Sequence, residues 1–165
     1  MGLDMYLSVR KYVSRVDFSQ DYDKSEGYRN TPEFDSLVDT LGVSEFIEPQ
    51  DFTGIGVEVP VMYWRKANAI HKWFVDEQAG GVDECQPINV SSESLKELLD
   101  LCEKELSYKY EPGLYLPTES GFFFGSTAYD EYYIQDLEYT RDRLKQVIET
   151  MEKSGDRFAV YQASW

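Results

Sequence analysis

Alternating apolar and polar residues indicate a strand at each end of the chain. Within residues 3–13 the apolar positions 3, 5, 7 and 9 alternate with polar ones, which is the period of a half-buried strand. A similar alternation over 157–165 predicts a strand at the C-terminus. A second strand is expected over 55–59, which Pro60 ends or bends, and a third strand or extended linker over 86–90. Both ends of the chain are therefore expected to lie in one sheet.

Apolar residues at spacings of three and four predict helices between these strands. A short helix is expected from Thr31 to Gly42, because an N-cap residue and a proline begin it and a glycine ends it. Ser91 or Ser92 caps an amphipathic helix, and a long helix with one apolar stripe runs to about Lys153.

The stretch Tyr63–Phe74, YWRKANAIHKWF, holds two of the three tryptophans and the only histidine. It is apolar on more than one side, and we interpret it as a central, largely buried helix. With this fourth helix, the pattern predicts a single globular α+β domain over residues 1–165. Its sheet should be small and mainly antiparallel, with both termini as strands and about four helices covering it.

The charge of the chain limits its partners. The formal net charge is −15 over 165 residues, and only residues 61–78 carry more basic than acidic groups. A field this negative repels phosphates and membrane surfaces, so a conventional nucleic-acid binder would need a local basic groove, which only the small stretch 61–78 could supply. No apolar run approaches the roughly 20 residues of a membrane span, and no signal segment precedes the first strand. We therefore expect a soluble protein, which would be cytoplasmic if it is bacterial or viral.

No motif of a catalytic, cofactor or metal site stands out. Cys85 and Cys102 lack metal-ligand spacing and are expected to be inert. Residues 21–27 approach the calcium-loop pattern, but the glycine and the following glutamate each come one residue late, so a solvated acidic loop is expected. Any imidazole chemistry must use His71, and no nucleophile motif is present. The sequence predicts no catalytic residue, no metal and no cofactor, and it favours a protein that is not an enzyme.

The basic stretch supplies one candidate ligand site. On a helix, Arg65, Asn68 and Lys72 would share one face, with His71 beside Asn68. Their donors suit a phosphate, nucleotide or carboxylate ligand, or equally the clamping of internal carboxylates. Both interpretations stay open. If a ligand binds, the aromatic residues that complete its site are Trp64 and Tyr129.

Residues 121–125, GFFFG, precede an aromatic and acidic run that ends at Tyr133. The segment is either an edge or turn that fills the core before a serine or threonine N-cap, or a binding loop. The sequence leaves both interpretations open.

Three blocks of the sequence carry a resemblance to known proteins. The start MGLDMYL, the stretch YWRKANAIHKWFV and the segment LPTESGFFFGSTAYDEYY resemble a family of small uncharacterised proteins found in bacteriophages and prophage regions. The blocks are spread over nearly the whole chain. The resemblance carries no activity, but it implies a phage accessory protein that works in a bacterial cell.

Small acidic phage accessory proteins commonly block host defences by presenting carboxylates to a DNA-binding groove. The resemblance thus implies an inhibitor of anti-CRISPR or anti-restriction type that mimics DNA. Its partner would be a basic host or phage protein that handles nucleic acid, with no direct binding to nucleic acid or membrane. The candidate carboxylates of this surface are Asp17, Asp21, Asp23, Glu26, Glu93, Glu97, Asp100, Glu103 and Glu105. The alternatives are a small-molecule protein that uses the basic stretch, and a self-associating component of open oligomeric state.

Overall fold

The computed structural model describes residues 2–17, 29–48, 54–108 and 110–165. It divides into two compact units: Met1–Val9 with Val59–Trp165, and Arg10–Glu58. The elements are β1 (Asp4–Ser14), α1 (Pro32–Leu41), the 3₁₀ turn η1 (Ser44–Phe46), β2 (Gly54–Arg65), α2 (Asn68–Trp73), the π-helical turn η2 (Phe74–Gln78), β3 (Ile88–Val90), α3 (Ser92–Ser107), α4 (Glu131–Ser154) and β4 (Arg157–Ser164).

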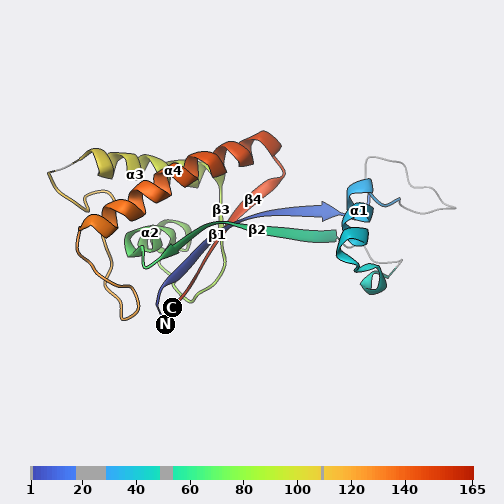
Figure 1. The fold of residues 1–165 in the computed structure, drawn as a ribbon, viewed down its shortest axis with the longest axis horizontal. Coiled ribbons are helices and arrows are strands. Elements are labelled where there is room, and N and C mark those ends of the chain that lie inside the picture. The colour runs from blue at the N-terminus through green and yellow to red at the C-terminus, as the bar shows by residue number, and fades with distance from the viewer. Residues whose placement is uncertain (1, 18–28, 49–53, 109) are drawn as a thin grey trace. The chain divides into compact units, whose positions relative to one another are not determined.

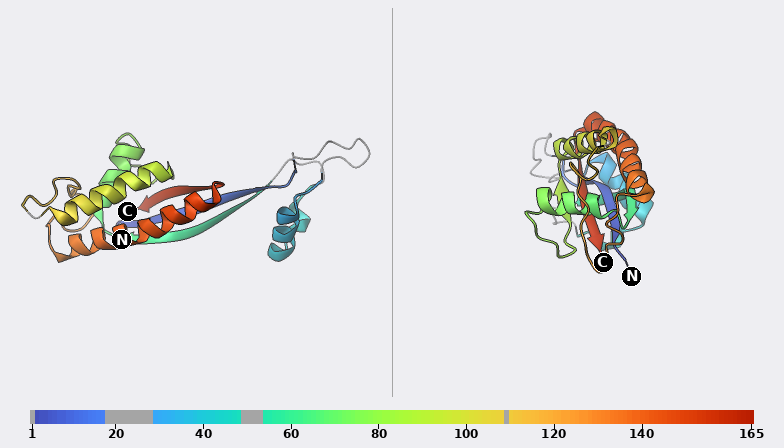
Figure 2. Two further views of the ribbon diagram at one scale, coloured as in Figure 1. Left: turned by 90° about the horizontal axis from the view of Figure 1, so that it is seen from above. Right: turned by 90° about the vertical axis from the view of Figure 1, so that its left-hand side faces the viewer.

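The four strands form an antiparallel sheet in the order β2-β1-β4-β3. β3 pairs with β4 so that Ile88 lies opposite Tyr161 and Val90 opposite Ala159. The two terminal strands occupy the middle of the sheet, and both ends of the chain lie beside each other in every view (Figures 1 and 2). The predicted α+β fold, with strands at both termini, is confirmed.

The core of the larger unit lies between the sheet and the helices α2, α3 and α4. Alternate residues of the strands, among them Met5 and Tyr161, are fully buried there, and the Tyr161 ring stacks on Phe74 with centroids 3.9 Å apart. α3 and α4 run beside each other (Figure 1), and an ion pair between Lys145 and Glu103 (2.6 Å) joins them. Among the described residues, no helix is long and apolar enough to cross a membrane.

Local sequence signals fix the helix ends. The side chains of Thr31 and Ser91 each accept a hydrogen bond from the backbone three residues ahead, and Gly155 ends α4 with a φ of +64°. The expected serine or threonine N-cap of α4 is wrong, because Asp130 takes that position. Its Oδ1 accepts hydrogen bonds from the backbone N–H groups of Tyr132 (3.0 Å) and Tyr133 (3.3 Å).

The smaller unit holds α1, η1 and the parts of β1 and β2 that fall within residues 10–58. Within it Lys11 forms an ion pair with Glu33 (2.7 Å), and Arg10 forms one with Glu58 (2.7 Å). Asp17 is half-buried. The stretch 21–27, predicted to be an acidic loop and to include the surface residues Asp21, Asp23 and Glu26, lies outside the described residues.

The predicted central helix over Tyr63–Phe74 is wrong over residues 63–67. β2 continues through Pro60 to Arg65, with Met62 and Trp64 buried and Tyr63 and Arg65 exposed. Pro60 is tolerated because β2 lies at the edge of the sheet, where one side of a strand needs no ladder donors. The chain then turns at Lys66, whose φ is +67°, and α2 begins at Asn68.

Candidate functional site

The corrected path of the chain separates the residues of the predicted ligand site. Arg65 ends a strand and Lys72 lies on a helix, so the expected common face does not exist. The Nζ atom of Lys72 pairs with Asp76 Oδ2 at 2.5 Å, and its hydrogen bond to that carboxylate raises the pKa of the lysine. Arg65 and Lys72 therefore do not form the shared helical face that the sequence predicted.

Asn68 acts as an internal clamp. The side chain is 3% exposed. Its Nδ2 donates to the carbonyl oxygens of Phe124 (3.0 Å) and Ser126 (2.8 Å), and its Oδ1 accepts from the N–H of Glu119 (3.1 Å). One amide thus holds the 119–126 segment against the start of α2.

The GFFFG segment within this loop forms a tight turn. The N–H of Phe124 donates to the carbonyl of Gly121 (3.1 Å), and the carbonyl of Phe123 accepts from the N–H of Leu3 (3.1 Å). The Phe124 ring packs edge-on against His71 at 5.0 Å, whereas Phe122 is 96% exposed. The turn therefore contributes one ring to the interior and presents another to the surface.

His71 is buried, with 1% of its surface exposed. Its Nδ1 lies 2.7 Å from the hydroxyl of Tyr161, and its Nε2 lies 3.1 Å from the carboxylate of Asp83, which also accepts from the indole N–H of Trp165. A neutral imidazole satisfies both contacts when the Tyr161 hydroxyl donates to Nδ1 and Nε2–H donates to Asp83. Both ring nitrogens are thus occupied by structural partners.

Replacing His71 with phenylalanine is expected to lower the free energy of unfolding by about 2 kcal/mol, because the buried hydroxyl of Tyr161 loses its acceptor. Urea unfolding followed by tryptophan fluorescence measures this loss. Lys72→Ala, which removes an exposed ion pair one residue away, is the control and should change stability by no more than about 0.5 kcal/mol. Equal effects of the two changes would contradict the structural role of the imidazole.

The aromatic residues of the predicted ligand site also have internal partners. The indole N–H of Trp64 donates to Thr140 Oγ1 at 2.8 Å, and the hydroxyl of Tyr129 accepts from the N–H of Thr118 at 3.3 Å. The Tyr129 ring lies so close to Gly113 that a Cβ there would overlap it, and Gly113 has a φ of +83°. These contacts favour the structural interpretation of both aromatic residues.

The two cysteines are unpaired. Burial raises the pKa of the Cys102 thiol to about 12, which leaves no thiolate at neutral pH, and Cys85 is half-buried. In the part of the chain that the structure describes, no three histidine, cysteine or acidic side chains gather as metal ligands.

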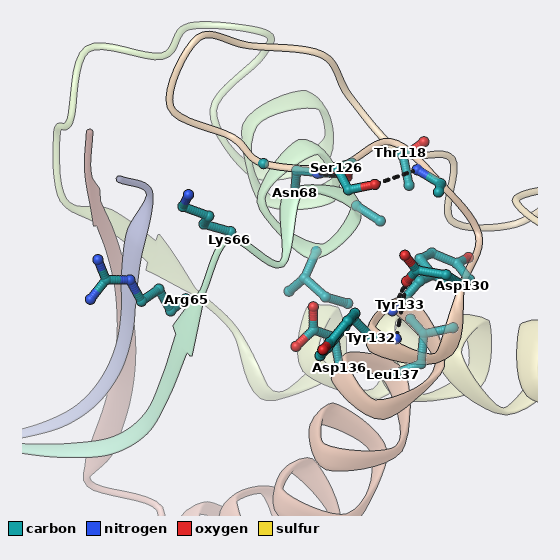
Figure 3. A pocket seen from close by; sticks show the side chains of 14 residues that line it. Arg65, Lys66, Asn68, Thr118, Ser126, Asp130, Tyr132, Tyr133, Asp136 and Leu137 are labelled. Atoms are coloured by element: carbon teal, nitrogen blue, oxygen red, sulfur yellow. Dashed lines mark hydrogen bonds between the residues drawn. The ribbon is translucent and has the colours of Figure 1, made fainter. Parts of the chain in front are cut away.

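A cavity of about 280 Å³ lies between the β2–α2 turn and the first turns of α4. It is lined by Arg65, Lys66, Asn68, Ala69, Ile70, Thr118, Gly125, Ser126, Ala128, Asp130, Tyr132, Tyr133, Asp136 and Leu137. Figure 3 shows the Asp136 carboxylate and Tyr132 on the α4 side of this cavity, while the head groups of Arg65 and Lys66 extend away from it. The charged groups that face the space are therefore carboxylates.

The environment of Asp136 disfavours its charged form. Burial, and to a smaller extent the charge of Asp130, raise the pKa of Asp136 from 3.8 to about 6. Sequence reasoning missed both residues as a site. One feature of the sequence could have pointed to them: no lysine, arginine or histidine occurs between Tyr110 and Thr140 to neutralise these carboxylates.

Because the raised pKa of Asp136 means that the folded state binds its proton more tightly, this group's contribution to stability is complete below pH 4 and is lost as the pH rises through 6. Asp136→Asn is therefore expected to raise stability at pH 7 by about 1 kcal/mol, a figure reduced to allow for screening by water. Urea unfolding of both proteins at pH 4 and pH 7 tests this. A difference that is the same at both pH values would contradict it.

The segment 110–140, here called the acidic aromatic segment, carries six carboxylates and nine aromatic residues. Six of its aromatic side chains are substantially exposed: Tyr110, Tyr115, Phe122, Tyr129, Tyr132 and Tyr139. Exposed aromatic residues interspersed with carboxylates are typical of a protein-binding surface rather than of a solvated loop.

The acidic surface predicted on α3 is weaker than its sequence indicates. Asp100 pairs with Lys104 of the same helix at 2.5 Å, and Glu103 pairs with Lys145. Glu105 does not belong to this surface, because it is buried. Glu93 and Glu97 are exposed. The carboxylates on this helix are thus largely neutralised or isolated.

Comparisons with protein-family models, with curated proteins and with solved structures found no match. The geometry of the described residues is therefore the basis for a functional proposal.

Proposed function

We propose that this protein is a phage accessory protein that binds a basic, nucleic-acid-handling protein in the cytoplasm of the bacterial host and inhibits it. The observation that carries the proposal is the acidic aromatic segment, with six carboxylates, no basic residue and six exposed aromatic side chains. Carboxylates attract a surface built for phosphates, and exposed tyrosine and phenylalanine supply the buried area that a stable complex needs.

This proposal places the contact surface on the acidic aromatic segment rather than on α3. A surface that mimics DNA presents charges without internal counterions, whereas Asp100 and Glu103 of α3 have lysine partners. Glu93 and Glu97 would then add long-range attraction only.

Inhibition of purified defence enzymes tests the proposal. A panel of restriction endonucleases and CRISPR effector complexes would be assayed for DNA cleavage with and without the protein, at rising salt concentration. We expect one enzyme to be inhibited at low salt, with inhibition that weakens steeply as salt is added. Cleavage that is unaffected across the panel at low salt would overturn the proposal.

Charge reversals locate the surface. Three exposed carboxylates of the acidic aromatic segment would be changed together: Glu111→Lys, Glu131→Lys and Glu138→Lys. This variant should no longer inhibit the enzyme. The matched control carries lysine at Glu45, Glu77 and Glu97, which are exposed elsewhere, and changes the net charge equally. Loss of inhibition by the control alone would place the contact outside the acidic aromatic segment.

The alternative, a nucleotide or phosphate ligand held by the basic stretch, has less support. The polar groups of Asn68 and His71 already have internal partners, and the cavity beside them faces the carboxylate of Asp136. A phosphate in that space would be repelled.

A further inference from the structure

We infer that the cavity between the β2–α2 turn and α4 receives a basic side chain, lysine or arginine, from the protein partner. This inference rests on the proposed function, which supplies a basic partner, and it adds the point at which that partner is anchored.

The walls of the cavity fit an alkyl stem. Ala69, Ile70 and Leu137 line it together with the aliphatic part of Lys66. Lysine and arginine bury three or four methylene groups along apolar walls of this kind while their charged ends reach polar groups. A cavity of about 280 Å³ has room for one such side chain together with water.

The charge of the cavity selects a cation. The carboxylate of Asp136 accepts no hydrogen bond from any residue that the structure describes. Asp130 uses Oδ1 to cap α4, which leaves its Oδ2 available. The cationic ends of Arg65 and Lys66 extend away from both carboxylates (Figure 3). Among the residues that the structure describes, these two carboxylates on one wall form no ion pair, and an incoming cation would stabilise both.

Tyr132 adds a third recognition element. Its side chain lines the cavity and is 76% exposed. An exposed tyrosine ring beside a cation site attracts lysine and arginine through its π face. It also lies within the acidic aromatic segment, so the cavity opens on the surface proposed for docking.

Binding of single amino-acid probes tests the inference. The full chain, labelled with ¹⁵N, would be titrated with N-acetyl-lysine N-methylamide, its arginine counterpart and its norleucine counterpart, which has a similar stem but no charge. We expect saturable shifts at the amides of residues 65–70 and 126–137 with lysine or arginine, at millimolar concentrations because the probe is small. Norleucine should give none.

Two variants identify the carboxylate. Asp136→Asn should weaken binding of the cationic probe by about tenfold or more, whereas Glu138→Gln, an exposed carboxylate of α4 outside the cavity, should leave it unchanged. In the wild type, affinity should rise between pH 5 and 7 as Asp136 ionises in the presence of Asp130, Arg65 and Lys66. That rise should be absent from Asp136→Asn.

The inference is overturned if norleucine binds as well as lysine and arginine, if no probe binds, or if both variants behave alike. A failure of this inference can be distinguished from a failure of the proposed function. An enzyme inhibited equally by the wild type and by Asp136→Asn would leave the proposed function standing and refute the anchor. Probe binding lost in Asp136→Asn, with no enzyme inhibited, would support the cation site and refute the proposed function.

Discussion

Replacing Glu105 with alanine is expected to lower the free energy of unfolding by about 4 kcal/mol. The side chain is 4% exposed. Its Oε1 accepts a hydrogen bond from the N–H of Gly113 (2.5 Å), and its Oε2 accepts from those of Tyr115 (2.8 Å) and Leu116 (3.3 Å). Alanine would leave three backbone donors without an acceptor at the end of α3, where a loop folds over the core. Urea unfolding followed by fluorescence gives the loss.

Two further substitutions separate the hydrogen bonds from other effects of the change. Glu105→Gln keeps the volume and one acceptor oxygen, so it should lose about half as much stability as alanine. Glu97→Ala removes an exposed carboxylate from the same helix and should stay within about 0.5 kcal/mol of the wild type. A Glu105→Ala protein as stable as Glu97→Ala would show that the loop does not depend on this carboxylate.

The burial of Glu105 could be predicted from the sequence, but its hydrogen-bond partners could not. It lies three residues after Cys102 and seven after Leu98, so helical spacing places it on the buried stripe of α3. The prediction that Glu105 belongs to an acidic surface considered only its charge and not its position on the helix. Its partners could not be inferred, because they are backbone groups of a loop whose path no side-chain pattern specifies.

The helix predicted over Tyr63–Phe74 was partly wrong for a related reason. The alternation of Met62 and Trp64 with Tyr63 and Arg65 spans only four residues, and it runs directly into a helix of high apolar content. So short an alternating pattern is easily mistaken for part of the neighbouring helical pattern. The boundary is a left-handed residue, Lys66, and a lysine gives no sign of that conformation in a sequence.

Elements with local signals were predicted well. Thr31, Ser91 and Gly155 specify helix ends through contacts within a few residues, so the sequence contains the necessary information. The cavity, in contrast, is not specified by contacts between residues close in sequence. It joins the β2–α2 turn to residues from 118 onward, and such proximity follows from the tertiary fold alone.

Replacing Asn68 with alanine is expected to cost about 3 kcal/mol, because two carbonyl groups and one N–H of the 119–126 segment lose a buried partner. The loss should be largest within that segment. Hydrogen exchange should increase at the amide of Glu119, which donates to Asn68, while the amides of α3 should show only the global loss of stability. Unchanged protection at Glu119 would contradict the clamp.

Asn68→Asp tests the direction of these hydrogen bonds. Aspartate has nearly the same shape and still accepts from the N–H of Glu119, but it turns a carboxylate oxygen toward the carbonyls of Phe124 and Ser126. At pH 7 it should therefore be at least as destabilising as alanine, although it changes far less volume. As the pH falls and the carboxyl group gains a proton, one donor returns, so Asn68→Asp should become more stable than Asn68→Ala. A fixed order of the two variants at every pH would indicate that shape, rather than hydrogen-bond donation, holds the segment in place.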